Sequence, residues 1–214
     1  APNHAPTLTT VAALSGATQG QPFTITYAML AGAANEADVD GDALSFRVET
    51  VAGGTLAIGD FSDTVGAVTL SSGSITGANG TLSGSSYSIT NAAGNSTISA
   101  KLGGAGTLTK TGAGFVKISY LAPIANVGNI VINGGSLSLE ATTDLGQNTG
   151  KTITINNGGQ LNFYSTVARN NATIVINDGG TLFNQNANML WYGNVSAGLG
   201  TSVINTGGNN TGND

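Results

Sequence analysis

The sequence predicts an all-β fold in which a parallel β-helix follows an N-terminal β-sandwich-like or capping segment. Three observations support this prediction. A short phrase recurs along the second half of the chain, aliphatic and polar residues alternate within it, and the composition combines 33 glycines with only 8% charged residues. Regular recurrence is typical of stacked repeats, in which every copy is one structural unit. A chain of 214 residues is long enough to bury a sizeable core in this way.

The repeated phrase is written four times. Its copies begin at Asn129, Thr152, Thr173 and Thr201, and they read NIVINGGSL, TITINNGGQL, TIVINDGGTL and TSVINTGG. The interval is about 22 residues for the first two steps and somewhat longer for the last, which is a solenoid period. Isoleucines at alternate positions share one face of a strand, and the glycines that follow let the backbone turn through positive φ. Strands this short cannot bury their apolar edges alone, so we expect each copy to stack on the next as a rung of a β-helix.

One asparagine stands at the first corner of every copy. Stacked side-chain amides hydrogen-bond from one rung to the next in other cross-strand arrays, so the repeat predicts an asparagine ladder. The alternative is that asparagine is present only because it tolerates the left-handed turn conformation. The four positions are Asn133, Asn156, Asn177 and Asn205.

Charge and cysteine content exclude several kinds of protein. The net charge is −5 and the six lysines and arginines are scattered singly, so no basic patch marks a nucleic-acid partner or an anionic membrane surface. The chain has no cysteine, which excludes disulfides and thiol chemistry. No apolar run reaches the ~20 residues of a membrane span, so we expect no membrane insertion of this segment. A chain with few charged residues and many β-branched and turn-forming residues is typical of secreted scaffolds, and we expect an extracellular or cell-surface location.

The N-terminal part of the chain differs in texture from the rest. We expect residues 1–58 to form a separate module and residues 59–214 to form the β-helix. Residues 28–42 predict a short helical turn followed by an acidic loop. Three runs within the module alternate as strands do, at residues 6–14, 21–30 and 43–51.

The acidic loop holds a candidate calcium site. Asp38, Asp40 and Asp42 alternate around Gly41, and carboxylates at this spacing with a turn-forming glycine can wrap around Ca²⁺. The spacing is similar to the start of an EF-hand loop, but the residue at the twelfth position, Glu49, falls inside an expected strand. The alternative is a solvated acidic turn held by hydrogen bonds from the backbone to aspartate side chains.

Three segments of the first module share a recognisable pattern: APNHAPTLTTV, PFTITYAML and EADVDGDALSFRVE. They resemble the cadherin-like or immunoglobulin-like tandem modules of large bacterial surface adhesins, in which a D-x-D-G-D-x-L segment precedes a core strand. The resemblance is confined to residues 1–58 and implies a β-sandwich array, in some cases rigidified by Ca²⁺. The later strands of such a sandwich are not recognisable, so we expect a partial module or an N-terminal cap of the β-helix.

The middle of the chain leads into the repeats. Residues 61–100 contain short alternating strands broken by Gly-Ser and Asn-Gly pairs, and GTLTKTGAGFVKIS and NGGSLSLEATTDLGQ follow. From about residue 103 to residue 146 the chain resembles the autotransporter-associated β-strand repeat, with weaker copies of its second half at 153–163 and 174–183. The resemblance implies a right-handed β-helix in the secreted passenger region of a bacterial adhesin, associated with the outer membrane.

We do not expect an enzyme. The one histidine, His4, lies in an expected linker beside Pro6, where no catalytic triad can be built around it. A carbohydrate-active β-helix enzyme would need clustered carboxylates with a basic residue nearby, and four charged residues could gather on one face of two rungs. The alternative, which we favour, is that these and the other charged residues of the β-helix are isolated, solvated groups. The four are Asp144, Lys151, Arg169 and Asp178, and the other bases are Lys101, Lys110 and Lys117.

Aromatic residues late in the chain are candidates for ligand contact. Tyr164, Trp191 and Tyr192 could form an outward stripe that stacks on sugar rings. The alternative is that Trp191 fills a loop in the long interval between the third and fourth copies.

Threonine pairs such as Thr152 and Thr154 are similar to the flat arrays of ice-binding solenoids. Such an array needs the same pair in rank on successive rungs. The residues expected opposite Thr154 are Val131, Val175 and Val203, so the rank is interrupted and the sequence alone does not favour this function.

These observations favour a structural and adhesive segment of a large secreted or cell-surface bacterial protein, acting as a β-helical stalk in cell adhesion. The expected partners are a host or neighbouring cell surface and its glycans. One alternative hypothesis is a carbohydrate-binding or carbohydrate-active β-helix. The other is a self-assembling extracellular fibre that associates through the ends of the solenoid, because residues 206–214 offer no apolar cap for an open coil. We also expect the chain to be a piece of a longer protein.

Overall fold

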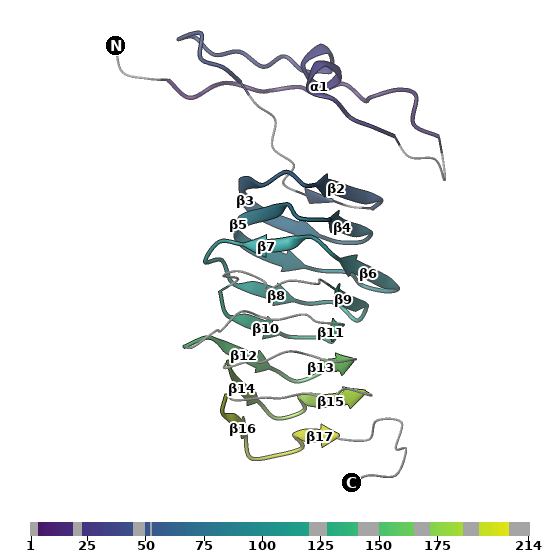
Figure 1. The fold of residues 1–214 in the computed structure, drawn as a ribbon, viewed down its shortest axis with the longest axis vertical. Coiled ribbons are helices and arrows are strands. Elements are labelled where there is room, and N and C mark those ends of the chain that lie inside the picture. Colours follow the sequence, from purple (N-terminus) through teal and green to yellow (C-terminus); the bar gives the residue numbers. More distant parts are fainter. Residues whose placement is uncertain are drawn as a thin grey trace. The chain divides into compact units, whose positions relative to one another are not determined.

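The computed structural model describes residues 4–18, 23–44, 50–51, 53–119, 128–140, 150–164, 172–185 and 193–205. The chain divides into two compact units, Ala1–Arg47 and Val48–Asp214, each described here by itself (Figure 1). The larger unit is a parallel β-solenoid, which confirms the predicted all-β fold and its β-helix.

The solenoid consists of two parallel sheets between which the chain alternates. The first sheet runs in the order β1 (Thr50–Val51), β3 (Asp63–Leu70), β5 (Thr81–Ile89), β8 (Leu108–Lys110), β10 (Ile130–Ile132), β12 (Thr152–Ile155), β14 (Thr173–Ile176) and β16 (Val195–Ala197), with β7 (Lys101–Gly103) paired beside β5. The second sheet runs β2 (Thr55–Gly59), β4 (Ser74–Gly77), β6 (Asn95–Ile98), β9 (Phe115–Ser119), β11 (Gly135–Glu140), β13 (Gly159–Tyr164), β15 (Thr181–Gln185) and β17 (Val203–Asn205). Figure 1 shows the strands of each sheet stacked rung upon rung.

The register follows the repeated phrase in its first three copies. Ile130 pairs with Ile153, and Ile153 with Ile174, all in parallel. In the second sheet Leu137 pairs with Leu161 in the same way. Like residues therefore lie above one another, as the stacked repeat predicts.

The core lies between the two sheets. Alternate side chains of each strand point inward, so aliphatic residues form continuous columns through the stack. Ile132, Ile155 and Ile176 form one such column and are fully buried. Burying side chains of this size stabilises the fold by about 1.5–3 kcal/mol each, and every rung depends on its neighbours for that burial.

The fourth copy of the phrase does not lie where the repeat predicts. Val203 pairs with Thr181 and Ile204 with Leu182, so this copy forms the second-sheet strand β17. The place next to β14 in the first sheet is taken by β16, in which Val195 pairs with Ile174. Every turn of a two-sheet stack needs a first-sheet strand before its second-sheet strand. In the last turn, NVSA supplies the first strand and leaves the recognisable phrase for the second.

One glycine of the corner motif is required by close packing. The Gly159 amide donates to the Asn156 carbonyl at 2.8 Å, which closes a tight turn. A Cβ atom at Gly159 would lie 2.4 Å from the carbonyl oxygen of Ile132 on the preceding rung, which is closer than real Cβ atoms come. Its neighbour Gly158 has φ +75° and open space around it, so it serves the backbone turn alone.

A tyrosine fills a break in the first sheet. Strand β5 pairs with β7 over its first residues and with β8 over its last, and Tyr87 lies beside the gap between those two strands. Its hydroxyl accepts a hydrogen bond from the Gly84 amide at 2.6 Å and lies 2.6 and 2.7 Å from its two acceptors, the carbonyl oxygens of Leu82 and Gly103. Burial, the largest cause, raises the pKa of this hydroxyl. Tyr87 thus joins backbone groups of β5 and β7 through hydrogen bonds beside the gap.

The first unit has a different construction. Helix α1 (Tyr27–Ala33) begins where the Thr26 hydroxyl accepts a hydrogen bond from the Met29 amide at 3.3 Å. Of the strand predicted at residues 6–14, the structure shows isolated antiparallel bridges, Thr7 to Ala37 and Val11 to Ala34. No side chain among the described residues of this unit is buried.

Two predictions for the N-terminal part need correction. The strand predicted at 21–30 is wrong in its second half, where the cap at Thr26 and the helix-forming residues Ala28–Leu30 favour α1. The boundary predicted after residue 58 is wrong, because β2 pairs with β4 and Leu56 and Ile58 pack against the solenoid core. The strand predicted at 43–51 lies mostly outside the described residues.

Candidate functional site

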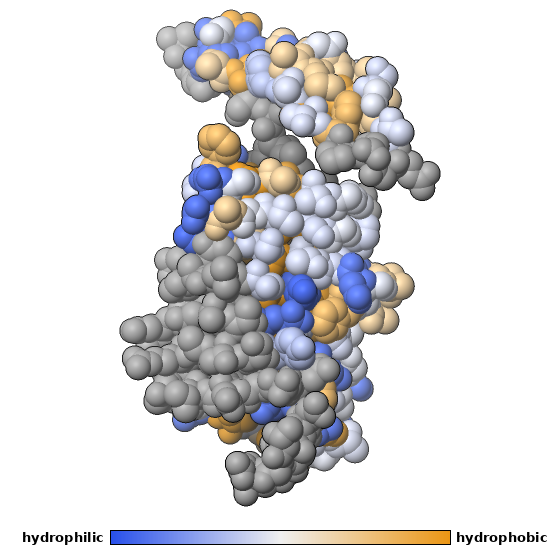
Figure 2. Space-filling model, turned by 45° about the vertical axis from the view of Figure 1, so that its right-hand side comes forward, coloured by the Kyte–Doolittle hydropathy of each residue, from blue (hydrophilic) through white to orange (hydrophobic). Residues whose placement is uncertain are grey.

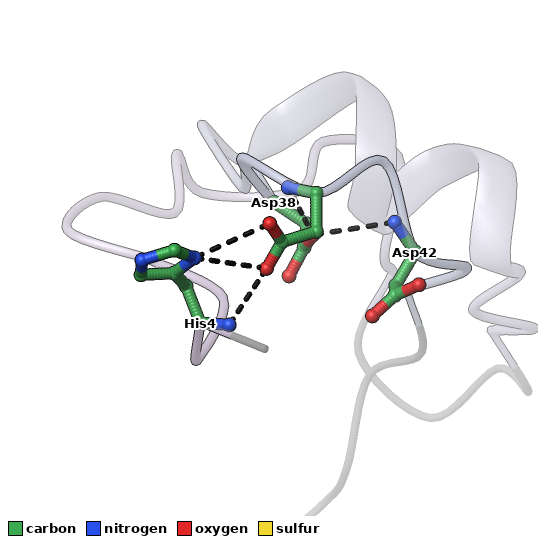
Figure 3. A network of polar contacts seen from close by, with 4 residues as sticks. His4, Asp38 and Asp42 are labelled. Carbon is green, nitrogen blue, oxygen red and sulfur yellow. Dashed lines mark hydrogen bonds and ion pairs between the residues drawn. The ribbon is translucent and has the colours of Figure 1, made fainter. Parts of the chain in front are cut away.

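The acidic loop of the first unit is held by its own backbone. Oδ1 of Asp38 accepts hydrogen bonds from the amide of Asp40 at 2.9 Å and from the amide of Asp42 at 3.2 Å (Figure 3). These are the aspartate–backbone bonds of a local turn, the alternative that the sequence left open beside calcium.

The second carboxylate of the loop contacts the one histidine. Oδ2 of Asp40 accepts from the His4 amide at 2.6 Å, and the His4 Nδ1 atom lies 3.1 Å from the same oxygen (Figure 3). His4, predicted to lie in a linker, is therefore fastened to this loop. The described residues contain no group of three or more histidine, cysteine, aspartate or glutamate side chains that could hold a metal ion. The geometry does not gather Asp38, Asp40 and Asp42 into a ligand set, and calcium binding stays a prediction.

A lysine lies inside the solenoid core, a feature that the sequence analysis missed. Lys110 is fully buried in the inward column between Ile89 and Ile132. Its ammonium donates to the carbonyl oxygens of Thr111 at 2.6 Å, Gly112 at 2.8 Å and Gly134 at 3.3 Å. Burial lowers the pKa of this ammonium from its ordinary value. The prediction that this charge is solvated is therefore wrong.

Periodicity could have revealed the buried lysine. In the segment LTK, Lys110 follows Leu108 at the spacing by which Ile132 follows Ile130. The pattern thus places Lys110 at an inward position. The expectation of solvent exposure came only from the charge of its ammonium group. Its long stem allows the ammonium to reach the carbonyl groups at the corner.

The outer face of the second sheet carries a mixed polar and aromatic cluster. The Lys117 ammonium lies 3.4 Å from Oε2 of Glu140, and Glu140 is the register partner of Tyr164 on the next rung. The Tyr164 side chain faces outward, as predicted, and is 43% exposed. On the same strand the Gln160 side-chain amide donates to Oδ1 of Asn162 at 2.5 Å. Asn162 itself is buried, at 4% exposure. We call the three residues Lys117, Glu140 and Tyr164 the Tyr164 cluster.

Two of the predicted ligand residues, Trp191 and Tyr192, lie outside the described residues, as do Asp144 and Arg169 of the charged group. Asp178 is exposed at a corner of the solenoid, where Oδ1 accepts from the Thr201 amide at 2.6 Å and the Thr201 hydroxyl at 2.8 Å. These two hydrogen bonds lower the pKa of its carboxyl group. Asp178 therefore fastens the following turn, and a carboxyl with a lowered pKa is not suited to donate a proton as a general acid.

The asparagine ladder is present at three of its four predicted positions. The Asn156 amide donates to Oδ1 of Asn133, and the Asn177 amide donates to Oδ1 of Asn156, both at 2.6 Å. Asn205 does not continue the ladder, because it lies in the second sheet opposite Phe183. Gly198 stands at the position after Asn177 and ends the ladder, because it has no side chain. Its backbone amide donates to the Ile176 carbonyl, just as the backbone amide of Asn177 donates to the Ile155 carbonyl.

Comparison with known proteins adds no family. No family model, curated protein or solved structure matches this chain. Among the described residues, no helix is both long enough and apolar enough to cross a membrane. Any proposal about function therefore rests on the solenoid, on its surfaces and on the sequence resemblances described above.

Proposed function

We propose that this chain is a structural and adhesive segment of a large secreted or cell-surface bacterial protein. In this proposal the solenoid is a stalk, and its outer faces display binding surface to a host or neighbouring cell. The proposal includes no catalytic step. Its bacterial and extracellular setting rests on the resemblance to adhesin and autotransporter repeats described above.

The observation that carries the proposal is the parallel pairing of successive strands, which runs from β3 to β16 in the first sheet and from β2 to β17 in the second. In such a stack each added rung lengthens the unit by one strand spacing, about 4.8 Å, while using the same inward and outward positions. A longer solenoid therefore needs only more copies of the same buried positions. This property is suited to a spacer. On the part of the solenoid that is coloured in Figure 2, many side chains are pale and weakly polar and hydrophobic atoms form small separate groups, which supports the same interpretation.

The Tyr164 cluster supports the adhesive part of the proposal. An exposed tyrosine ring offers an apolar face for the carbon side of a sugar ring. The neighbouring Glu140 carboxylate and Lys117 ammonium offer an acceptor and donors for its hydroxyl groups. We propose a neutral or weakly charged glycan as the ligand of this surface.

A glycan array tests the proposal directly. The full chain is applied with and without millimolar Ca²⁺, beside two alanine variants of exposed aromatic residues. Tyr164→Ala should lose binding, whereas Phe61→Ala, which removes an 82% exposed ring far from the cluster in sequence, should retain it. An array without any specific binding, or equal losses in both variants, would contradict the adhesive assignment.

Calcium is tested in the same samples by thermal unfolding. If Asp38, Asp40 and Asp42 bind Ca²⁺, the first unit should melt at a higher temperature in millimolar Ca²⁺, and Asp38→Asn should remove the shift. An unchanged melting temperature would leave the backbone-held turn as the full description of this loop.

A further inference from the structure

The outer face of the first sheet is a regular lattice of uncharged side chains. Three outward positions on each of six successive rungs, from β5 to β16, form three columns that run along the stack. They are Ser86, Ser88 and Thr90; Thr107, Thr109 and Thr111; Asn129, Val131 and Asn133; Thr152, Thr154 and Asn156; Thr173, Val175 and Asn177; and Asn194, Ser196 and Gly198. We call these eighteen residues the hydroxyl lattice.

The observed register changes one of the neighbours predicted for Thr154 on this face. The middle column follows the pairing from Ser88 through Thr109, Val131, Thr154 and Val175 to Ser196. Val203, expected opposite Thr154, belongs to the other sheet, and a hydroxyl residue, Ser196, stands in its rank. The interruption is thus limited to two valines, which alternate with hydroxyl residues along the column.

The lattice has fixed spacings. Neighbouring rungs lie about 4.8 Å apart, and alternate residues of one strand lie about 6.7 Å apart. Parallel pairing holds this grid in register from rung to rung. The hydrogen bonds from Asn156 to Asn133 and from Asn177 to Asn156 join one border column directly, and side-chain ladders of this kind keep a sheet flat.

The chemistry of the lattice favours one kind of ligand. None of its eighteen residues is charged and none is aromatic, so it lacks the ring faces and ion pairs with which proteins grip sugars and anionic partners. It offers hydroxyl and amide groups, which hydrogen-bond to water, beside methyl groups of threonine and valine. Because the two spacings are constant along the stack, these groups repeat periodically across the face. The outer positions Thr107, Asn129 and Asn177 are exposed, so the face is accessible.

We propose that the hydroxyl lattice binds the surface of ice. Hydroxyl and amide groups would take the places of lattice water molecules, and the methyl groups would order the water between them. This function is independent of the proposed glycan adhesion, because it uses the opposite sheet and none of the residues of the Tyr164 cluster.

Partition into slowly growing ice tests the proposal. The full chain is mixed with serum albumin, ice is grown from the solution, and both proteins are measured in the ice and in the remaining liquid. We expect the chain to be enriched in the ice relative to albumin. Thr154→Lys and Thr109→Lys, which place an ammonium in the middle of the lattice, should each abolish the enrichment. Thr181→Lys, the same change on the outer face of the second sheet, should leave it intact.

Three results would overturn the proposal. The first is a chain excluded from ice as albumin is, and the second is an equal loss in all three variants, each shown to be folded by circular dichroism. The third is a dimer in sedimentation that Thr154→Lys dissociates, because the lattice would then be the interface between two copies of the chain. The glycan array is unaffected by any of these results, so the two proposals can fail separately.

Discussion

The two units of this chain are stabilised in different ways. In the solenoid, apolar side chains from both sheets are buried in columns, whereas no described side chain of the first unit is buried. The first unit keeps its form through hydrogen bonds, such as those from the Thr9 and Thr10 amides to the Asn35 side chain at 3.1 and 2.8 Å. Burial by stacking concentrates stability in the repeated part, and substitutions in the two units should differ accordingly.

The largest difference is expected for a charge placed in each unit. Ile155→Asp puts an unpaired carboxylate into a fully buried column between Ile132 and Ile176, and should lower the free energy of unfolding by about 4 kcal/mol or more. Ile25→Asp replaces a side chain of the first unit that is 55% exposed. It should change the free energy of unfolding by less than about 0.5 kcal/mol. Urea unfolding followed by circular dichroism measures both. If the two variants lose similar free energies of unfolding, the first unit must bury side chains as the solenoid does, and the comparison fails.

A second difference lies between two adjacent glycines of one solenoid corner. Gly159→Ala should destabilise the solenoid by about 1–3 kcal/mol, because its Cβ would press on the Ile132 carbonyl. Gly158→Asn should be close to neutral, since its surroundings are open and asparagine tolerates positive φ. Thermal unfolding of the two variants checks this order, and a more stable Gly159→Ala chain would refute the close packing of rungs at this corner.

The asparagine ladder should contribute less than the core. Asn156→Ala removes the hydrogen bonds to Asn133 and from Asn177, and should cost about 1–3 kcal/mol at roughly 0.5–1.5 kcal/mol per bond. The matched control is Asn95→Ala, an exposed asparagine on β6 away from the ladder. If urea midpoints of the two variants coincide, the ladder has no net stabilising role.

The smallest effect is expected from pH, through the buried lysine. Because burial lowers the pKa of Lys110 in the folded chain, the unfolded chain binds more protons as pH approaches the ordinary lysine value of 10.5. Wild-type stability should therefore rise with pH in the window just below 10.5, and Lys110→Met should lack this rise. Tyr87, whose pKa is raised, acts in the opposite direction above pH 10, so the measurement belongs below that pH. Parallel stability curves would contradict a buried ammonium.

Much of the solenoid could be predicted from the sequence, because its rules are local. Alternation places Ile132, Ile155 and Ile176 inward, and the interval between copies sets their stacking. The last turn was misjudged because pairing follows the order of strands along the chain, and the degenerate NVSA segment fills a rung as well as the recognisable phrase does. Lys110 was wrongly expected to be solvated, because its position in the alternating pattern, and not its charge, determines which way the side chain points.

The candidate sites were harder to predict. The asparagine at each corner indicated the ladder, whereas the pairing of His4 with Asp40 joins residues 36 apart in the sequence and no local pattern indicates it. The hydroxyl lattice depends on which strands are neighbours. The sequence placed Val203 where the register has Ser196, whereas Val131 and Val175 remain in the column as expected. Surface sites on a solenoid are therefore known only once the register is known.

The direction of the hydrogen bonds between rungs has a mechanical consequence. These bonds run along the stacking axis, so tension applied between the two ends of the solenoid would load them one layer at a time and peel the turns in sequence. Each released turn, of about 22 residues, would add about 70 Å of contour length. Single-molecule stretching should then show a series of small, evenly spaced extensions, the behaviour of a tether that yields gradually and keeps its remaining turns folded.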